Sequence, residues 1–118
     1  MAYGLNAQRR DIMEKKVRIT VLKKQFYEDL AERFLTSGKA AGPCLLLNEG
    51  DIYMFTGQAT TPEGFCPWAW NDIASAVGAV SSGSSHEPWY NRPDLMIECC
   101  KDGIRPVSFL LERLEEDC

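Results

Sequence analysis

The sequence predicts a small α+β domain, in which a mainly antiparallel sheet is covered on one face by two helices. The first observation is the segment 17–21, where valine and isoleucine alternate with polar residues at the period of a half-buried strand. The second is an Asp-Gly dipeptide between the apolar segments 95–100 and 106–114, which is typical of a β-hairpin. The third is helical spacing of apolar residues at 25–35 and 67–81. A compact β-barrel with helical insertions is the alternative.

The chain divides into an N-terminal extension, residues 1–15, and a single domain, residues 16–118. Positions 6–16 are compatible with a helix that is either frayed or packed on a neighbouring subunit. The amphipathic helix at 25–35 carries an aromatic stripe that we interpret as part of the core covering the sheet. A loop and an apolar run follow, and then a short strand is predicted at 52–55.

Cys66 is predicted to be the N-cap of the second helix. Pro67 is favoured at the first helical position, because the N–H group that proline lacks would be unpaired there. The serine- and glycine-rich segment 81–93 is interpreted as a solvated linker, with a lid over the N-terminus of the helix or its neighbourhood as the alternative. In the last hairpin, the turn at Asp102-Gly103 is expected to require positive φ angles.

Composition limits the classes of partner. The chain has 118 residues, of which 45% are hydrophobic, so it can form one core, and its net charge is −4. The acidic balance argues against a nucleic-acid partner, because phosphate groups are bound by basic surfaces. No apolar run reaches the roughly 18 residues of a membrane span, and the N-terminus lacks the apolar region of a signal peptide. We therefore expect a cytoplasmic protein with no nucleic-acid or membrane partner.

The N-terminus of a helix is a favourable place for a reactive thiol. The N–H groups of the first turn and the partial positive charge there favour the thiolate form. Cys66 is therefore the candidate catalytic or redox thiol, and a small buried apolar residue is the equally weighted alternative. Trp68 lies outside the apolar stripe of the helix and near Asp72, so both are candidate ligand-binding residues. Arg105 is a third candidate, suited to a carboxylate or a phosphate.

The remaining cysteines suggest a metal site. Five cysteines are many for an intracellular chain of this length, and their odd number argues against a disulfide framework. Cys44, Cys66, Cys99 and Cys100 are candidate ligands. Only one of Cys99 and Cys100 can join a common site, because adjacent strand residues point to opposite faces. Such a three-thiolate site would suit zinc, copper(I) or an iron–sulfur cluster. Structural cysteines are the alternative.

Several motifs occur together in the chain. These are the strand 17–24, GPC at 42–44, EGD at 49–51, PEGFCPWAW at 62–70 and CCKDGIRPV at 99–107. In combination, they resemble a family of short uncharacterised cysteine-containing proteins of mostly anaerobic bacteria and archaea. The resemblance covers about residues 16–115 and assigns no reaction, cofactor or catalytic residue. It implies a stand-alone cytoplasmic protein, in which anaerobic life would suit labile thiol or metal chemistry. The N-terminal extension and Cys118 lie outside it.

Three functions remain open from the sequence. The first is a binding protein whose cysteine-lined pocket at a helix N-terminus holds a metal ion or a small ligand. The second is a thiol-dependent enzyme or redox protein that uses Cys66. The third is a non-catalytic interaction module with structural cysteines. A homodimer is also expected, because the N-terminal extension and the sheet edges offer surfaces for a second copy.

Overall fold

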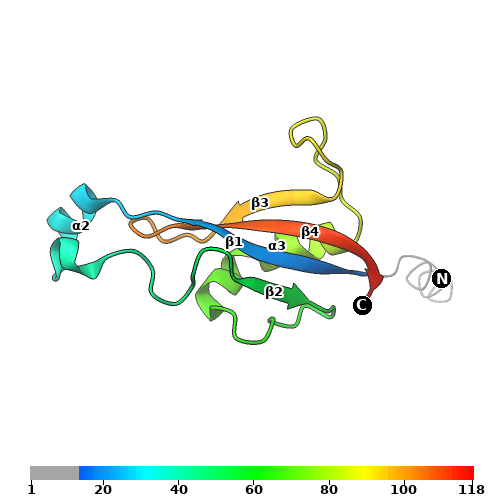
Figure 1. Cartoon of the computed structure of the whole chain (residues 1–118), viewed down its shortest axis with the longest axis horizontal. Coiled ribbons are helices and arrows are strands. Elements are labelled where there is room, and N and C mark those ends of the chain that lie inside the picture. Colours follow the sequence, from blue (N-terminus) through cyan, green and yellow to red (C-terminus); the bar gives the residue numbers. More distant parts are fainter. Residues whose placement is uncertain (1–13) are drawn as a thin grey trace, which may run out of the picture.

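The computed structural model describes residues 14–118 and contains four strands, two α-helices and one 3-10 helix (Figure 1). In chain order these are β1 (Lys15–Lys24), α2 (Glu28–Phe34), η1 (Gly38–Ala41), β2 (Ile52–Phe55), α3 (Pro67–Ser81), β3 (Leu95–Cys99) and β4 (Val107–Asp117). Strand β1 includes residues 15 and 16, which the sequence had placed at the end of a helix. The rest of that predicted helix, with residues 1–13, lies outside the described residues.

An antiparallel sheet with the strand order β2-β1-β4-β3 forms the centre of the fold. The long strands β1 and β4 pair in the middle, and the short strands β2 and β3 form the edges. Val17, Ile19 and Val21 are buried on one face of β1, as their alternation predicts. The α+β class with an antiparallel sheet is therefore confirmed. The barrel alternative is wrong, because β2 and β3 do not pair with each other to close the sheet.

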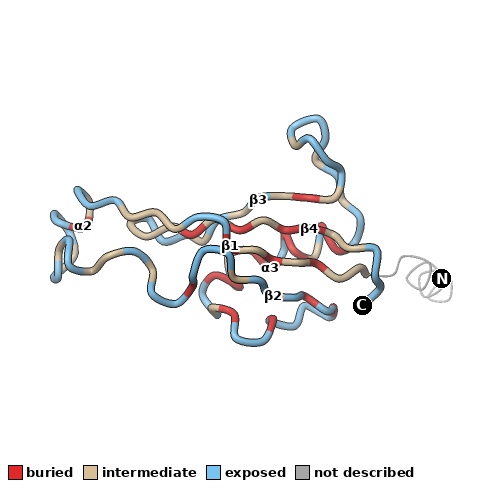
Figure 2. Tube along the Cα trace, viewed as in Figure 1, coloured by how far each residue is buried: buried red, intermediate tan, exposed pale blue. Residues whose placement is uncertain are grey.

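Helix α3 covers one face of this sheet and forms the core together with the strands. Ile73 and Val77 are fully buried against the sheet, and the ring of Trp70 stacks on that of Phe55 at 5.9 Å between centroids. Phe65 lies just before the helix, and its ring contacts that of Phe109 at 5.3 Å. Figure 2 shows the buried positions gathered along α3 and the central strands, while the ends of the molecule are exposed.

The helix predicted at 25–35 forms as α2, but it does not cover the sheet. It packs on η1 at one end of the molecule, beyond the last strand residues (Figure 1). Helix α2 is displaced because, after β1 ends, the chain continues alongside the connection between β3 and β4. Gln25 N–H donates to the Pro106 carbonyl and Tyr27 N–H to that of Ile104, both at 2.9 Å. Only Ala31 of α2 is buried, so the prediction of two helices on one face is corrected to one.

The C-terminal end of α3 shows where the 81–93 segment belongs. Gly83 has a φ of 101° and donates its N–H to Val80, while Ser84 N–H donates to Ala79, which together form a Schellman motif. The segment therefore starts at the opposite end of a 15-residue helix from Cys66, roughly 22 Å away. Arg113 of β4 donates to the carbonyls of Val80, Ser84 and Pro93, so both ends of the segment are held at the C-terminal end of α3. The alternative of a lid over the helix N-terminus or its neighbourhood is therefore wrong. The described helices include none that is long and apolar enough to cross a membrane.

The β3–β4 hairpin is confirmed, but its turn is not a tight Asp-Gly turn. Strand β3 ends at Cys99 and β4 begins at Val107, so the connection is longer than two residues. Gly103 does not have a positive φ, and a Cβ atom there would meet nothing within 4 Å. The connection is shaped instead by Asp102, whose Oδ1 accepts the N–H groups of Ile104 and Arg105 at 2.9 and 2.8 Å.

Candidate functional site

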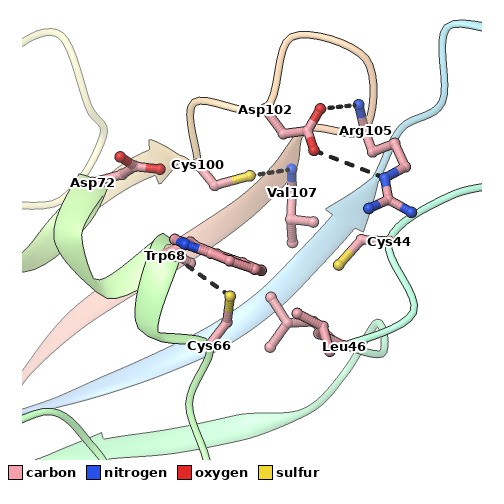
Figure 3. Close-up of a pocket in the computed structure, with 11 residues that line it drawn as sticks. Cys44, Leu46, Cys66, Trp68, Asp72, Cys100, Asp102, Arg105 and Val107 are labelled. Atoms are coloured by element: carbon pink, nitrogen blue, oxygen red, sulfur yellow. Dashed lines mark hydrogen bonds and ion pairs between the residues drawn. The ribbon is translucent and has the colours of Figure 1, made fainter. Parts of the chain in front are cut away.

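A cavity of about 140 Å³ lies beside the N-terminus of α3 (Figure 3). Its walls come from the first turns of α3, the irregular segment around residues 44–47 and the connection between β3 and β4. The apolar part of the lining is formed by Leu46, Leu47, Ala69 and Val107. Cysteine, tryptophan, aspartate and arginine side chains complete it, so the cavity combines an apolar interior with a few polar groups, as ligand sites do.

Cys66 occupies the N-cap position of α3, as predicted. Its backbone is extended, with φ −64° and ψ 121°, and Pro67 is the first residue of the helix. Its Sγ accepts the N–H of Ala69 at 3.5 Å, which satisfies one of the N–H groups that a helix start leaves without an intrahelical partner. The side chain is half-buried and lines the cavity. The helix cap therefore fixes where this thiol lies.

Of the adjacent pair, only Cys100 lines the cavity. Its Sγ accepts the N–H of Val107 at 3.3 Å, at the start of β4. Cys99 is exposed and is not part of the cavity, which agrees with the alternation of strand residues. Partial burial of the sulfur raises the pKa of the Cys99 thiol, and the nearby Cys100 raises it further. Cys99 is thus set apart from the site both in position and in chemistry.

Cys44 completes a set of three thiols around one cavity. It is half-buried, follows Pro43 in the irregular segment after η1, and faces the cavity below Arg105 (Figure 3). Cys44, Cys66 and Cys100 therefore come from three separate parts of the chain. The structure brings these predicted site residues together and leaves Cys99 out.

The described residues do not show the arrangement expected of the predicted metal site. Among the described residues 14–118, no group of three or more His, Cys, Asp or Glu side chains is arranged so that it could hold a metal ion. Cys66 and Cys100 lie on different walls of the cavity, where their sulfurs accept the N–H groups of Ala69 and Val107. The structure therefore gives no support to a zinc, copper(I) or iron–sulfur site built from Cys44, Cys66, Cys99 and Cys100.

Trp68 and Asp72 both line the cavity, with different surroundings. The indole of Trp68 projects from the first turn of α3 toward the cavity, and 74% of the residue is exposed (Figure 3). It forms one wall of the cavity. Asp72 accepts the backbone N–H of Lys101 through Oδ2 at 2.8 Å. Its carboxylate therefore joins α3 to the β3–β4 connection, which is a structural role that the sequence did not indicate.

Arg105 lines the cavity beside the carboxylate of Asp102. The sequence predicted Asp102 as a turn residue and did not indicate that it contacts the site. The Nε of Arg105 is 3.8 Å from Oδ2 of Asp102, and the side chain of Arg105 is 35% exposed. The pKa of Asp102 is lowered: partial burial raises it, but the N–H groups of Arg105 and Ile104 and the charge of Arg105 outweigh that effect. Asp102 therefore stays ionised and positions the guanidinium.

Sequence reasoning also missed the apolar lining. The run Leu45–Leu47 was visible as a short apolar stretch, and it splits between a buried Leu47 and an exposed Leu45 and Leu46. The run itself was the only sequence signal, and it does not show which of its leucines line a cavity.

Comparison of the chain with models of known protein families, with curated proteins and with solved structures finds no match. The resemblance to the cysteine-containing family of anaerobes therefore stays a prediction.

Proposed function

We propose that this protein binds a small ligand in the thiol-lined cavity at the N-terminus of α3, with Cys66 in contact with the ligand. The observation that supports this most is the convergence of Cys44, Cys66 and Cys100 on one cavity from three separate segments. A purely structural role would not require these three thiols to share an open space. An engineered apolar cavity of about 150 Å³ holds benzene, so the ligand of this cavity is of similar size.

A thiol-dependent enzyme or redox protein is the second candidate. The N–H of Ala69 donates to the Cys66 sulfur, which holds this thiol at the edge of the cavity. A thiolate beside a cavity can attack an electrophilic atom of a bound molecule. In this version Cys66 is the nucleophile, Trp68 is the wall that orients the bound molecule, and Cys44 and Cys100 are neighbouring thiols.

Timed alkylation of the folded protein tests both candidates. Iodoacetamide is small enough to enter the cavity, whereas N-phenylmaleimide is bulkier, and mass spectrometry identifies which cysteine has reacted. We expect iodoacetamide at neutral pH to modify Cys66 faster than Cys99, because the raised pKa of Cys99 leaves less of its reactive thiolate. The bulkier reagent should lose this preference and favour the exposed Cys99 and Cys118.

The outcomes separate the candidates. Size-dependent access to Cys66 supports the binding cavity, and a rate above that of a free thiol supports thiol chemistry. If Cys66 stays unmodified by both reagents while Cys99 reacts, the cavity is closed. The cysteines are then structural, and the third possibility, an interaction module, is favoured. Elemental analysis of anaerobically purified protein is the direct check on a bound metal.

A further inference from the structure

The cavity has one cationic side chain among its lining residues, and this restricts the chemistry of a ligand. We infer that the ligand is a small monocarboxylate, which pairs its carboxylate with Arg105 and places an apolar body in the cavity. This inference rests on the ligand-binding function proposed above, and it goes further by naming the class of ligand.

The guanidinium of Arg105 is held in place but is not saturated. Asp102 approaches Nε alone, at 3.8 Å, which is an ion pair longer than a hydrogen bond. Within residues 14–118, neither terminal nitrogen of Arg105 has a hydrogen-bond partner, and Figure 3 shows that end of the side chain directed toward Cys44 and the cavity. A fork of two N–H donors with this freedom matches the two oxygens of a carboxylate.

The two aspartates of the cavity leave the terminal nitrogens of Arg105 free, because Oδ2 of Asp102 approaches Nε alone. Asp72 accepts the N–H of Lys101, and Oδ1 of Asp102 accepts those of Ile104 and Arg105. Each carboxylate is thus compensated by backbone donors and held by them. Their two negative charges nevertheless remain near the rim, so a monoanion is favoured over a dianionic phosphate, which they would repel more strongly.

The rest of the cavity fits an apolar body. Leu46, Leu47 and Val107 line it, and the face of Trp68 offers a flat wall. Burial of apolar ligand surface against these side chains contributes to binding in proportion to the area removed from water. With a volume of about 140 Å³, the cavity holds one ring or a short chain rather than a drug-sized molecule.

Calorimetric titration of the intact protein with benzoate and with benzamide tests this inference. The two probes have the same ring, and only benzoate carries a charge. We expect benzoate to bind at least about tenfold more tightly than benzamide, because the uncharged amide cannot form a charge-assisted hydrogen bond with Arg105. In Arg105→Gln this preference should disappear while benzamide still binds, and Arg105→Lys should keep only part of it, because lysine lacks the fork.

The matched control is Arg33→Gln, because Arg33 is an exposed arginine of α2 that does not line the cavity. It should leave the preference for benzoate unchanged. Equal binding of benzoate and benzamide would overturn the carboxylate inference while leaving the ligand-binding function in place. Competition by inorganic phosphate would overturn the choice of a monocarboxylate. Binding of neither probe at about 10 mM would overturn both the inference and a ligand of this size.

Discussion

We expect Cys66→Ala to destabilise the folded protein, because it removes the cap of α3. The sulfur accepts one backbone N–H, that of Ala69, at 3.5 Å. Loss of an oxygen cap costs about 0.5–2 kcal/mol, and sulfur is the weaker acceptor, so we place the cost at about 0.5–1 kcal/mol. For a domain of about 100 residues this corresponds to a decrease in Tm of about 2–5 °C.

Cys66→Ser should behave differently. Its hydroxyl oxygen can accept the same Ala69 N–H, and serine is among the preferred N-cap residues. We therefore expect this variant to be at least as stable as the unchanged protein. It should nevertheless lose any thiol chemistry and weaken binding of a ligand that contacts the sulfur. The pair of variants thus separates the structural role of the cap from the chemical role of the thiol.

Urea denaturation followed by tryptophan fluorescence measures the stability of both Cys66 variants, and Cys99→Ala is the matched control. Cys99 is exposed, so its loss should change stability by no more than about 0.5 kcal/mol. If Cys66→Ser loses as much stability as Cys66→Ala, the sulfur stabilises the fold by packing rather than by capping. The physical reason given for the position of this thiol would then be wrong.

Three further predictions concern the β3–β4 connection and assembly. Because the pKa of Asp102 is lowered, its contribution to stability is present above the unfolded pKa near 4 and is lost as pH falls through the folded pKa. Between about pH 5 and 3, the urea midpoint should therefore fall more for the unchanged protein than for Asp102→Asn. An equal fall in the two proteins would contradict this. Gly103→Ala should change stability by less than about 0.5 kcal/mol, because no positive φ or close neighbour requires glycine; a loss above about 1 kcal/mol in the same assay would restore the tight-turn interpretation. A homodimer should appear in light scattering at micromolar concentration and should weaken in a chain that starts at Glu14, whereas a monomer of the 118-residue chain would exclude it.

The parts of the fold that the sequence predicts are those set by local rules. Strand alternation buries Val17, Ile19 and Val21 on one face, and the Cys66-Pro67 pair marks the start of α3, because capping and proline placement involve only neighbouring residues. The same alternation separates Cys99 from Cys100. No partner far along the chain is needed for any of these inferences.

The parts that fail depend on distant contacts. The amphipathic pattern of α2 shows that one side prefers burial, but not which surface buries it. Its position is decided by the hydrogen bonds of Gln25 and Tyr27 to the β3–β4 connection. The sequence indicates only that Asp72 is a carboxylate on a helix. The structure shows that it accepts a hydrogen bond from the backbone N–H of Lys101, 29 residues away. The lid alternative for 81–93 could not be decided from the sequence, because nothing in that segment indicates which end of the helix it lies near.

The two aspartates that line the cavity, Asp72 and Asp102, hold its walls in place through hydrogen bonds to the backbone. Asp72 joins the first turns of α3 to the β3–β4 connection, and Asp102 orders that connection internally. The third wall is tied to β1, because the Lys24 ammonium donates to the Leu47 carbonyl at 2.8 Å. All three walls are thus held to the sheet and α3 by hydrogen bonds that need no ligand. A ligand that enters such a preformed cavity does not have to order it, so little of its binding free energy is lost to reorganisation.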